Sequence, residues 1–174
     1  ENLNVLPSNV NLSGAEIDLI GVDGREFILK ETLEMVRDLY EYIIIDCPPS
    51  LNILTVNAMA AADSVIVPIQ CEYYALEGLS QLIHTINLIQ ERLNENLEID
   101  GIVFTMFDKR TNLSTEVIEN VKENIQIKIY DTVIPRNVRL AEAPSYGLPI
   151  HMYDGKSAGA IAYNNLALEV IAEE

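Results

Sequence analysis

The sequence predicts an α/β protein in which a mainly parallel, twisted sheet is flanked by helices. Short apolar runs without polar alternation, such as residues 43–45 and 65–67, are typical of strands buried on both faces. Segments with apolar residues three and four positions apart separate these runs, as in amphipathic helices. Strands that alternate with helices along the chain indicate a parallel sheet. The 174 residues suit a single domain over residues 1–174.

The predicted elements follow one another without a linker or an internal repeat. A short strand over residues 3–6 ends at Pro7, and a helix then carries Leu29, Leu33 and Tyr40 on one face. The strand at 42–46 is apolar throughout, so we expect it to be buried on both faces. The remaining predicted elements are a helix at 53–62, a strand at 64–69, a long helix at about 79–93, a strand at 99–106, a helix at about 117–125, a strand that ends at Ile134 and Pro135, a short helix at 139–143 and a last helix at 158–172.

Composition argues against a nucleic-acid-binding protein and against a membrane-spanning one. A net charge of −16 and a pI near 4.3 argue against nucleic-acid binding, although Lys109, Arg110, Arg136, Arg139 and Lys156 leave a local basic patch open. No apolar run approaches the roughly 18 residues of a membrane span, and no secretion leader is visible.

The two cysteines are expected to be small core residues. Cys47 and Cys71 are far apart in the sequence, and each follows a predicted buried strand. We therefore interpret them as reduced thiols in a cytoplasmic protein. A shared iron–sulfur cluster, to which each chain contributes two thiolates, is the alternative with less support.

In open α/β sheets, ligands bind beyond the carboxyl ends of the strands. The segments to inspect are therefore 46–50, 70–74, 107–110 and 135–137. In the first, an apolar run ends in Asp46, which is the Walker B arrangement of P-loop NTPases. Such an aspartate holds Mg²⁺ through a bound water. The plainer alternative is an aspartate that only begins a turn. Pro48 and Pro49 directly after it predict a stiff loop.

Four sequence blocks, in order, resemble the ParA/Soj family of partitioning ATPases. They are residues 43–51, 70–79, 105–113 and 135–147, and residues 12–17 are also similar to the family. The resemblance covers essentially the whole chain. It implies a protein that binds Mg-ATP, forms a nucleotide-sandwich homodimer, binds DNA non-specifically and is stimulated by a ParB-type partner to segregate a chromosome or plasmid. It also implies a cytoplasmic, nucleoid-associated protein without a membrane partner.

The resemblance assigns roles residue by residue. Asp46 would hold Mg²⁺ through water, and Pro48, Pro49 and Ser50 would form switch II beside the γ-phosphate. Met106, Pro135, Arg136 and Asn137 would lie near the adenine. Glu72, Tyr73 and Tyr74 would lie toward the dimer face. Arg139 would bind DNA, with Arg136 and Lys156 as further candidates.

Each role has a plainer alternative. Glu72 would cap the following helix, Tyr73 and Tyr74 would be packing residues, and Met106 would belong to the core. Arg136 or Arg139 would pair with Glu142.

The chain departs from the family in two places. No G-x-x-x-x-G-K-[ST] string, the family's phosphate-binding loop, occurs in it, and the aspartate-bearing switch I is missing too. We therefore expect the P-loop βαβ portion of the sheet to be absent and this chain alone not to hydrolyse ATP. Ala158 stands where family members often carry an arginine, which weakens the DNA-binding expectation.

Three alternative functions remain. One is a non-enzymatic, P-loop-free binding module. Another is a MinD-like membrane-cycling ATPase, which the acidic residues 168–174 disfavour. The third is an iron–sulfur carrier of the related ATPase class.

Overall fold

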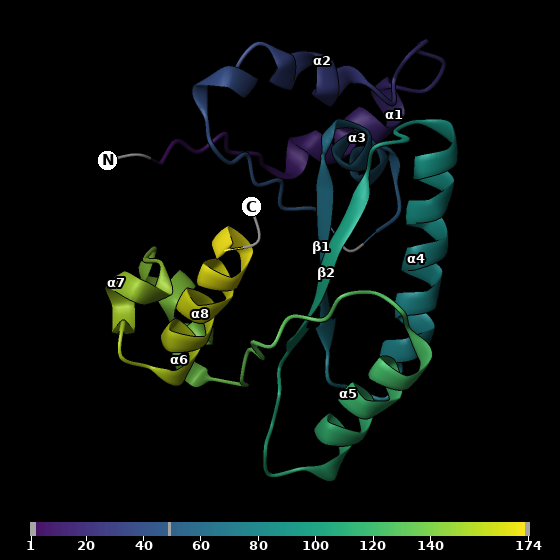
Figure 1. Ribbon diagram of the computed structural model, residues 1–174. Coiled ribbons are helices and arrows are strands. Elements are labelled where there is room, and N and C mark those ends of the chain that lie inside the picture. The colour runs from purple at the N-terminus through teal and green to yellow at the C-terminus, as the bar shows by residue number, and fades with distance from the viewer. Residues whose placement is uncertain (1–2, 49, 173–174) are drawn as a thin grey trace. The chain divides into compact units, whose positions relative to one another are not determined.

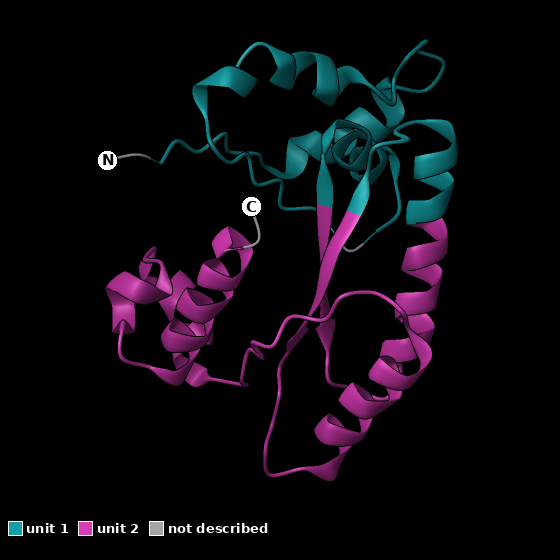
Figure 2. Ribbon diagram, viewed as in Figure 1, with its two compact units in different colours: residues 1–64, 86–98 teal, residues 65–85, 99–174 magenta. Residues whose placement is uncertain are grey.

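The computed structural model describes residues 3–48 and 50–172. The chain divides into two compact units, coloured separately in Figure 2. Unit 1 comprises residues up to 64 together with 86–98, and unit 2 comprises 65–85 together with 99 onward. The single domain predicted for residues 1–174 stays a prediction.

Unit 1 is built around one buried helix, α3 (Ile53–Ala61). Asn52 begins it, because the side-chain carbonyl of Asn52 accepts hydrogen bonds from the backbone N–H groups of Leu54 and Thr55 at 3.1 and 3.2 Å. Its middle residues Asn57, Ala58, Met59 and Ala60 are buried. α1 (Ala15–Asp18) and α2 (Ile28–Glu34) pack against it, while η1 (Val10–Gly14) contacts α1 and η2 (Arg37–Leu39) contacts α2.

Two asparagines satisfy backbone groups next to α3. The Asn57 side chain donates to the Arg25 carbonyl at 2.7 Å and accepts from the Leu29 N–H at 3.1 Å. The Asn94 amide donates to the carbonyls of Met59 and Ala62 at 3.0 and 2.7 Å. Buried polar side chains are stable when they are paired in this way.

Two predicted strands of unit 1 are wrong in this structure. Residues 3–6 and 42–46 form no strand. The side chains of Leu3 and Leu6 are more than 80% exposed, and that of Ile44 is 91% exposed. An apolar run becomes a buried strand only where neighbouring strands bond its backbone and other elements cover its faces, and neither segment has joined a sheet.

The sheet contains β1 (Ser64–Gln70) and β2 (Glu98–Thr105), which lie side by side in Figure 1 and are joined in sequence by α4 (Ala75–Arg92). Within unit 1, the Glu98 N–H bonds to the Asp63 carbonyl where both strands begin. Within unit 2, the Cys71 N–H bonds to the Thr105 carbonyl where both end. The start of β1 therefore lies beside the start of β2, and the end of β1 lies beside the end of β2, so the two strands are parallel. The predicted parallel sheet flanked by helices is confirmed.

The segment 128–136 follows α5 (Asn112–Asn124) and lies along β2 through two isolated parallel bridges, Ile102 with Ile129 and Phe107 with Pro135. The strand predicted to end at Ile134 and Pro135 is therefore only partly formed. The Ile102 carbonyl accepts from the Tyr130 N–H, and the Phe104 carbonyl accepts from the Ile134 N–H. The segment thus advances four residues while β2 advances two, so it bulges.

Glu169 satisfies the amides that this bulge displaces. Its carboxylate accepts the backbone N–H groups of Asp131 and Thr132, each at 3.0 Å. Glu169 belongs to α8 (Ala158–Ala172), so one side chain fixes the irregular segment to the last helix.

The last part of unit 2 consists of α6 (Val138–Glu142), η3 (Ala143–Tyr146), α7 (Ile150–Asp154) and α8. Its core combines Val103, Tyr130, Ile134 and Ala162 with Leu140, Leu166 and Val170. Gly159 permits close packing, because a Cβ atom there would lie 2.5 Å from Leu140 Cγ. None of the helices in the described part of the chain has the length and apolar character to cross a membrane.

Candidate functional site

In unit 1 the predicted magnesium ligand is exposed. Asp46 follows the extended apolar segment, and no basic side chain of the described residues forms an ion pair with it. Pro48 and Ser50 are exposed as well, and Pro49 lies outside the described residues. The Ser50 carbonyl accepts from Thr55 Oγ1 at 2.6 Å, and Ser50 Oγ accepts from Asn52 Nδ2 at 3.0 Å. The loop after Asp46 is thus anchored to the start of α3.

The exposed Asp46 carboxylate fits a water-mediated magnesium site. Among the residues that the structure describes, no three His, Cys, Asp or Glu side chains gather as metal ligands. Mg²⁺ does not need such a group, since it keeps several waters and is held by one or two carboxylates together with phosphates.

The two cysteines lie in different surroundings. Cys71 is buried, as predicted, and burial raises the pKa of its thiol to about 11. Cys47 is exposed, so its prediction as a core residue is wrong. It lies on the segment that has joined no sheet. Partial desolvation and then the charge of Asp46 raise the pKa of the Cys47 thiol above its ordinary value.

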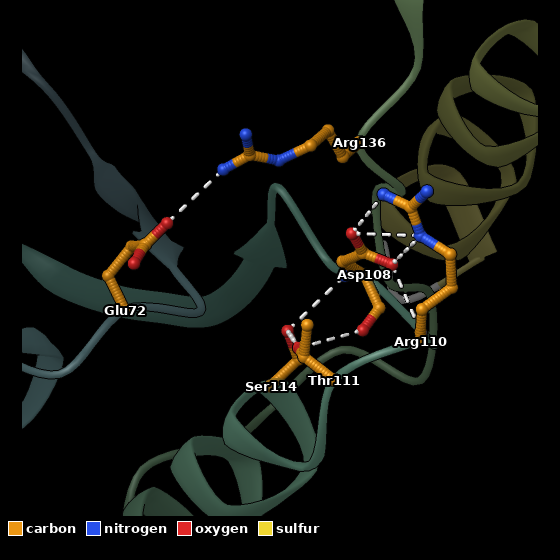
Figure 3. A network of polar contacts seen from close by, with 6 residues as sticks. All are labelled: Glu72, Asp108, Arg110, Thr111, Ser114 and Arg136. Atoms are coloured by element: carbon orange, nitrogen blue, oxygen red, sulfur yellow. Dashed lines mark hydrogen bonds and ion pairs between the residues drawn. The ribbon is translucent and has the colours of Figure 1, made fainter.

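In unit 2 the structure brings together three of the predicted site positions. Pro135 bridges to Phe107 directly after β2, and the Arg136 N–H donates to the Phe107 carbonyl at 2.9 Å. Arg136 Nη2 lies 3.2 Å from Glu72 Oε1, beyond the end of β1 (Figure 3). Met106, immediately before Phe107, is 38% exposed, so it is not a core residue.

The sequence assigned no role to Asp108, which lies in the inspected segment 107–110 and follows Phe107. Arg110 donates from Nε to one Asp108 carboxylate oxygen at 2.9 Å and from Nη2 to the other at 2.7 Å. This bidentate pair holds the pKa of the Asp108 carboxyl far below its usual range. The Asp108 N–H donates to Ser114 Oγ at 3.2 Å, and Thr111 Oγ1 donates to the Asp108 carbonyl at 3.1 Å (Figure 3). An aspartate shortly before a predicted helix was the available signal.

The predicted DNA-binding arginine is held inside its own unit. Arg139 Nη1 lies 2.8 Å from Glu142 Oε2, and its Nε lies 3.4 Å from Asp154 Oδ2. The Tyr153 hydroxyl donates to the same Glu142 oxygen at 3.1 Å. Hydrogen bonds from Arg139 and then Tyr153 lower the pKa of the Glu142 carboxyl. Arg139 therefore ties α6 to α7.

The local basic patch is largely neutralised. Arg110, Arg136 and Arg139 each pair with a carboxylate, while Lys156 is exposed after α7. Asn137 caps α6, because its side-chain carbonyl accepts the Arg139 N–H at 3.0 Å.

The tyrosine pair before α4 is open to solvent. Tyr73 and Tyr74 are 78% and 74% exposed, and their rings meet edge to face with centroids 5.1 Å apart. The Glu72 side chain pairs with Arg136, while its carbonyl accepts the Ala75 N–H at 3.0 Å.

A pocket of about 540 Å³ lies beside Pro135 within unit 2. It is lined by Asp131, Thr132, Val133, Pro135, Ala158, Ile161, Ala162 and Asn165. Its floor therefore combines the bulged segment with the first turns of α8.

Comparison with known proteins assigns the family. A model of the family described as an AAA domain matches residues 1–99, more than half of the chain. The sporulation initiation inhibitor protein Soj of Bacillus subtilis is 58% identical over 172 residues, which are 99% of this chain and 68% of that protein. The chain belongs to the ParA/Soj family.

Other ParA/Soj proteins match over the same extent. The chromosome-partitioning ATPase Soj of Treponema pallidum is 50% identical over 99% of this chain and 68% of its own length. For the chromosome partitioning protein ParA of Myxococcus xanthus, the identity is 51%, over 99% of this chain and 61% of that protein. The chain thus spans between three fifths and about two thirds of these relatives.

A solved structure gives the same fold to this ParA/Soj chain. The cobyrinic acid a,c-diamide synthase of Mycobacterium smegmatis, crystallised with bound ADP and magnesium, superimposes with a TM-score of 0.81 at 37% identity. The match covers 95% of this chain and 61% of that one.

Proposed function

We propose that this chain supplies the magnesium-binding and base-binding parts of a chromosome- or plasmid-partitioning ATPase. Asp46 holds Mg²⁺ through water, and Pro48, Pro49 and Ser50 form the loop beside the γ-phosphate. Met106, Pro135, Arg136 and Asn137 contact the adenine. Bound Mg²⁺ would neutralise charge on the phosphates of ATP.

The observation that carries this proposal is the exposed Asp46 carboxylate at the end of an apolar segment in a ParA/Soj chain, with which no basic side chain of the described residues forms an ion pair. A structural aspartate at a turn would be expected to bond to nearby backbone or basic groups. Within residues 3–48 and 50–172, no side chain pairs with the Asp46 carboxylate, which leaves it open to a hydrated cation, while the hydrogen bonds of Ser50 to Thr55 and Asn52 hold the loop after it.

The phosphate cradle is the part that this sequence does not contain. Backbone N–H groups and a lysine of a P-loop hold the β- and γ-phosphates in such ATPases, and the sequence has no G-x-x-x-x-G-K-[ST] string. We therefore propose that the 174 residues alone neither bind Mg-ATP tightly nor hydrolyse it.

The proposal extends to assembly and partners. Nucleotide-dependent dimerisation would use the face that bears Glu72, Tyr73 and Tyr74, since two large exposed aromatic side chains are favourable at interfaces. Non-specific DNA binding would use Arg139 and Lys156, and a ParB-type protein would stimulate turnover. A cytoplasmic, nucleoid-associated location follows from these roles.

Calorimetric titration of Mg-ATP tests whether tight nucleotide binding requires the P-loop portion that this sequence does not contain. The chain would be titrated alone and as a chimaera completed with the unmatched part of the Treponema pallidum Soj sequence. We expect heat of binding only from the chimaera. Tight binding by the 174 residues alone would mean that they hold the phosphates without a P-loop, and would overturn the proposal.

A further inference from the structure

Met106 has a strained backbone at the carboxyl end of β2. Its φ of +55° is the one left-handed value among the described non-glycine residues. The Phe104 carbonyl and the Phe107 N–H bond to Ile134, three positions apart where a regular ladder would have two. Met106 is therefore the extra residue of a β-bulge, at a position that usually carries glycine.

The bulge leaves the Met106 peptide groups available. Among the residues that the structure describes, neither the N–H nor the C=O of Met106 has a hydrogen-bond partner. A donor and an acceptor thus lie on a partly exposed residue, next to the bridge between Phe107 and Pro135. Because the N–H and C=O of a left-handed residue point in nearly opposite directions, a base edge meets only one of them. The N–H can donate to adenine N1, which is an acceptor, whereas guanine presents an N–H donor at that position.

A left-handed, non-glycine residue persists only where its surroundings hold it, and such strain gathers at functional sites. Before Met106, the Thr105 carbonyl is fixed by the Cys71 N–H at 3.1 Å. After it, Asp108 fixes the chain. Its carboxylate accepts the Arg110 backbone N–H at 3.0 Å as well as the guanidinium, and its own backbone N–H and C=O bond to Ser114 and Thr111 (Figure 3).

We propose that Asp108, through its bidentate pairing with Arg110, is a positioning residue that holds the Met106 bulge open and thereby makes the base site select adenine. The inference rests on the base site assigned above to Met106 and Pro135. Asp108 does not touch the base in this account. Its side chain is 18% exposed and faces the Arg110 guanidinium, which itself lies 80% in solvent.

Nucleosides test the inference on the chain as it stands, because they need no phosphate cradle. The four methionines would carry ¹³C labels at the methyl and Cα positions, with the Met106 signals assigned by Met106→Leu. Adenosine and guanosine at millimolar concentrations would be titrated into the wild type, Asp108→Asn and Arg110→Ala. Glu119→Gln, a change at an exposed carboxylate of α5, is the matched charge control.

We expect adenosine to shift the Met106 methyl signal of the wild type with about tenfold preference over guanosine, the size of effect that one hydrogen-bonded edge supplies. Asp108→Asn and Arg110→Ala should reduce that preference to below about threefold and move the Met106 Cα shift away from its left-handed value. Glu119→Gln should keep both. A merely structural role would not change the ratio between two nucleosides.

Two results would overturn the inference, and they differ. If both Asp108 and Arg110 variants keep the wild-type preference, positioning by Asp108 is wrong while the base site stands. If neither nucleoside perturbs Met106 in the wild type, the base site itself is wrong and the inference falls with it.

Discussion

Arg136 Nη2 lies 3.2 Å from Glu72 Oε1 and joins the residues that follow two different strands of unit 2. Both side chains are about half exposed, so water screens the pair. Its contribution to stability is therefore expected to be small. Its larger effect is on charge, because Glu72 neutralises a guanidinium that the proposed function places beside the nucleotide.

Replacing Glu72 with Gln should separate these two effects. We expect the free energy of unfolding to fall by less than about 1 kcal/mol. The affinity for a polyanion such as heparin should rise more than in Glu77→Gln, which removes the same charge from the first turn of α4. Urea unfolding and heparin retention measure the two quantities. Equal retention of both variants would show that Glu72 does not mask Arg136.

Two glycines should respond in opposite ways to alanine. Gly159→Ala places a Cβ atom 2.5 Å from Leu140 Cγ in the packed contact between α6 and α8, so we expect destabilisation by about 1–3 kcal/mol. Gly78 lies within α4, and nothing is within 4 Å of its added Cβ. Gly78→Ala should therefore stabilise by about 0.5–1 kcal/mol. Urea unfolding of both variants decides the matter, and a loss at Gly78 as large as that at Gly159 would contradict the packing.

Glu169 should protect two specific amides from exchange. Glu169→Ala leaves the Asp131 and Thr132 N–H groups without their acceptor, which we expect to cost about 1–3 kcal/mol. Glu169→Gln keeps one acceptor oxygen and should lose less. Amide hydrogen exchange should quicken at these two positions in the Ala variant. Unchanged exchange there would mean that the carboxylate does not hold the bulge.

The buried thiol of Cys71 predicts a loss of stability at alkaline pH. Its pKa is raised to about 11 in the folded protein from an ordinary value of 9.0, so its contribution is complete below pH 9 and is lost as the pH rises toward 11. The stability of the wild type relative to Cys71→Ala should fall across this range. The raised pKa of Tyr130 acts equally in both chains.

Urea midpoints between pH 7 and 11 would measure that difference. Cys47→Ala, which removes the exposed thiol, should alter the pH dependence less than Cys71→Ala. Parallel profiles for the wild type and Cys71→Ala would show that the thiol is not buried.

Most elements could be predicted from the spacing of their apolar residues, because that spacing shows which face of a helix or strand is buried, whatever packs against it. The long helix α4, α8, β1 and β2 all occupy nearly the expected residues. The segment 42–46 has the composition of a central strand, but composition does not supply neighbours, and the segment joins no sheet. Sequence pattern alone could not place the bulges at Met106 and at 131–132 either, because they depend on which carbonyl of β2 meets which amide.

The sequence predicted which residues belong to the candidate site better than it predicted which of them contact one another. Asp46, Met106, Pro135 and Arg136 were expected at strand ends, and unit 2 brings the last two together with Glu72. The pairing of Arg139 with Glu142 was an alternative that the structure bears out. Asp108 lies in the segment 107–110 that was marked for its position, but the sequence assigned it no role, because its importance depends on which side chains it contacts, namely Arg110, Thr111 and Ser114.

ATP turnover of the chimaera completed from Treponema pallidum Soj tests the central claim most directly. It would be measured with and without Asp46→Ala, and Asp38→Ala would remove an exposed carboxylate of the same unit as a control. We predict that the chimaera and its Asp38 variant hydrolyse ATP and that Asp46→Ala abolishes turnover, because Mg²⁺ loses the carboxylate that holds it together with the P-loop hydroxyl. Turnover by the Asp46 variant equal to that of the parent chimaera would contradict the assignment of Asp46 as the magnesium ligand.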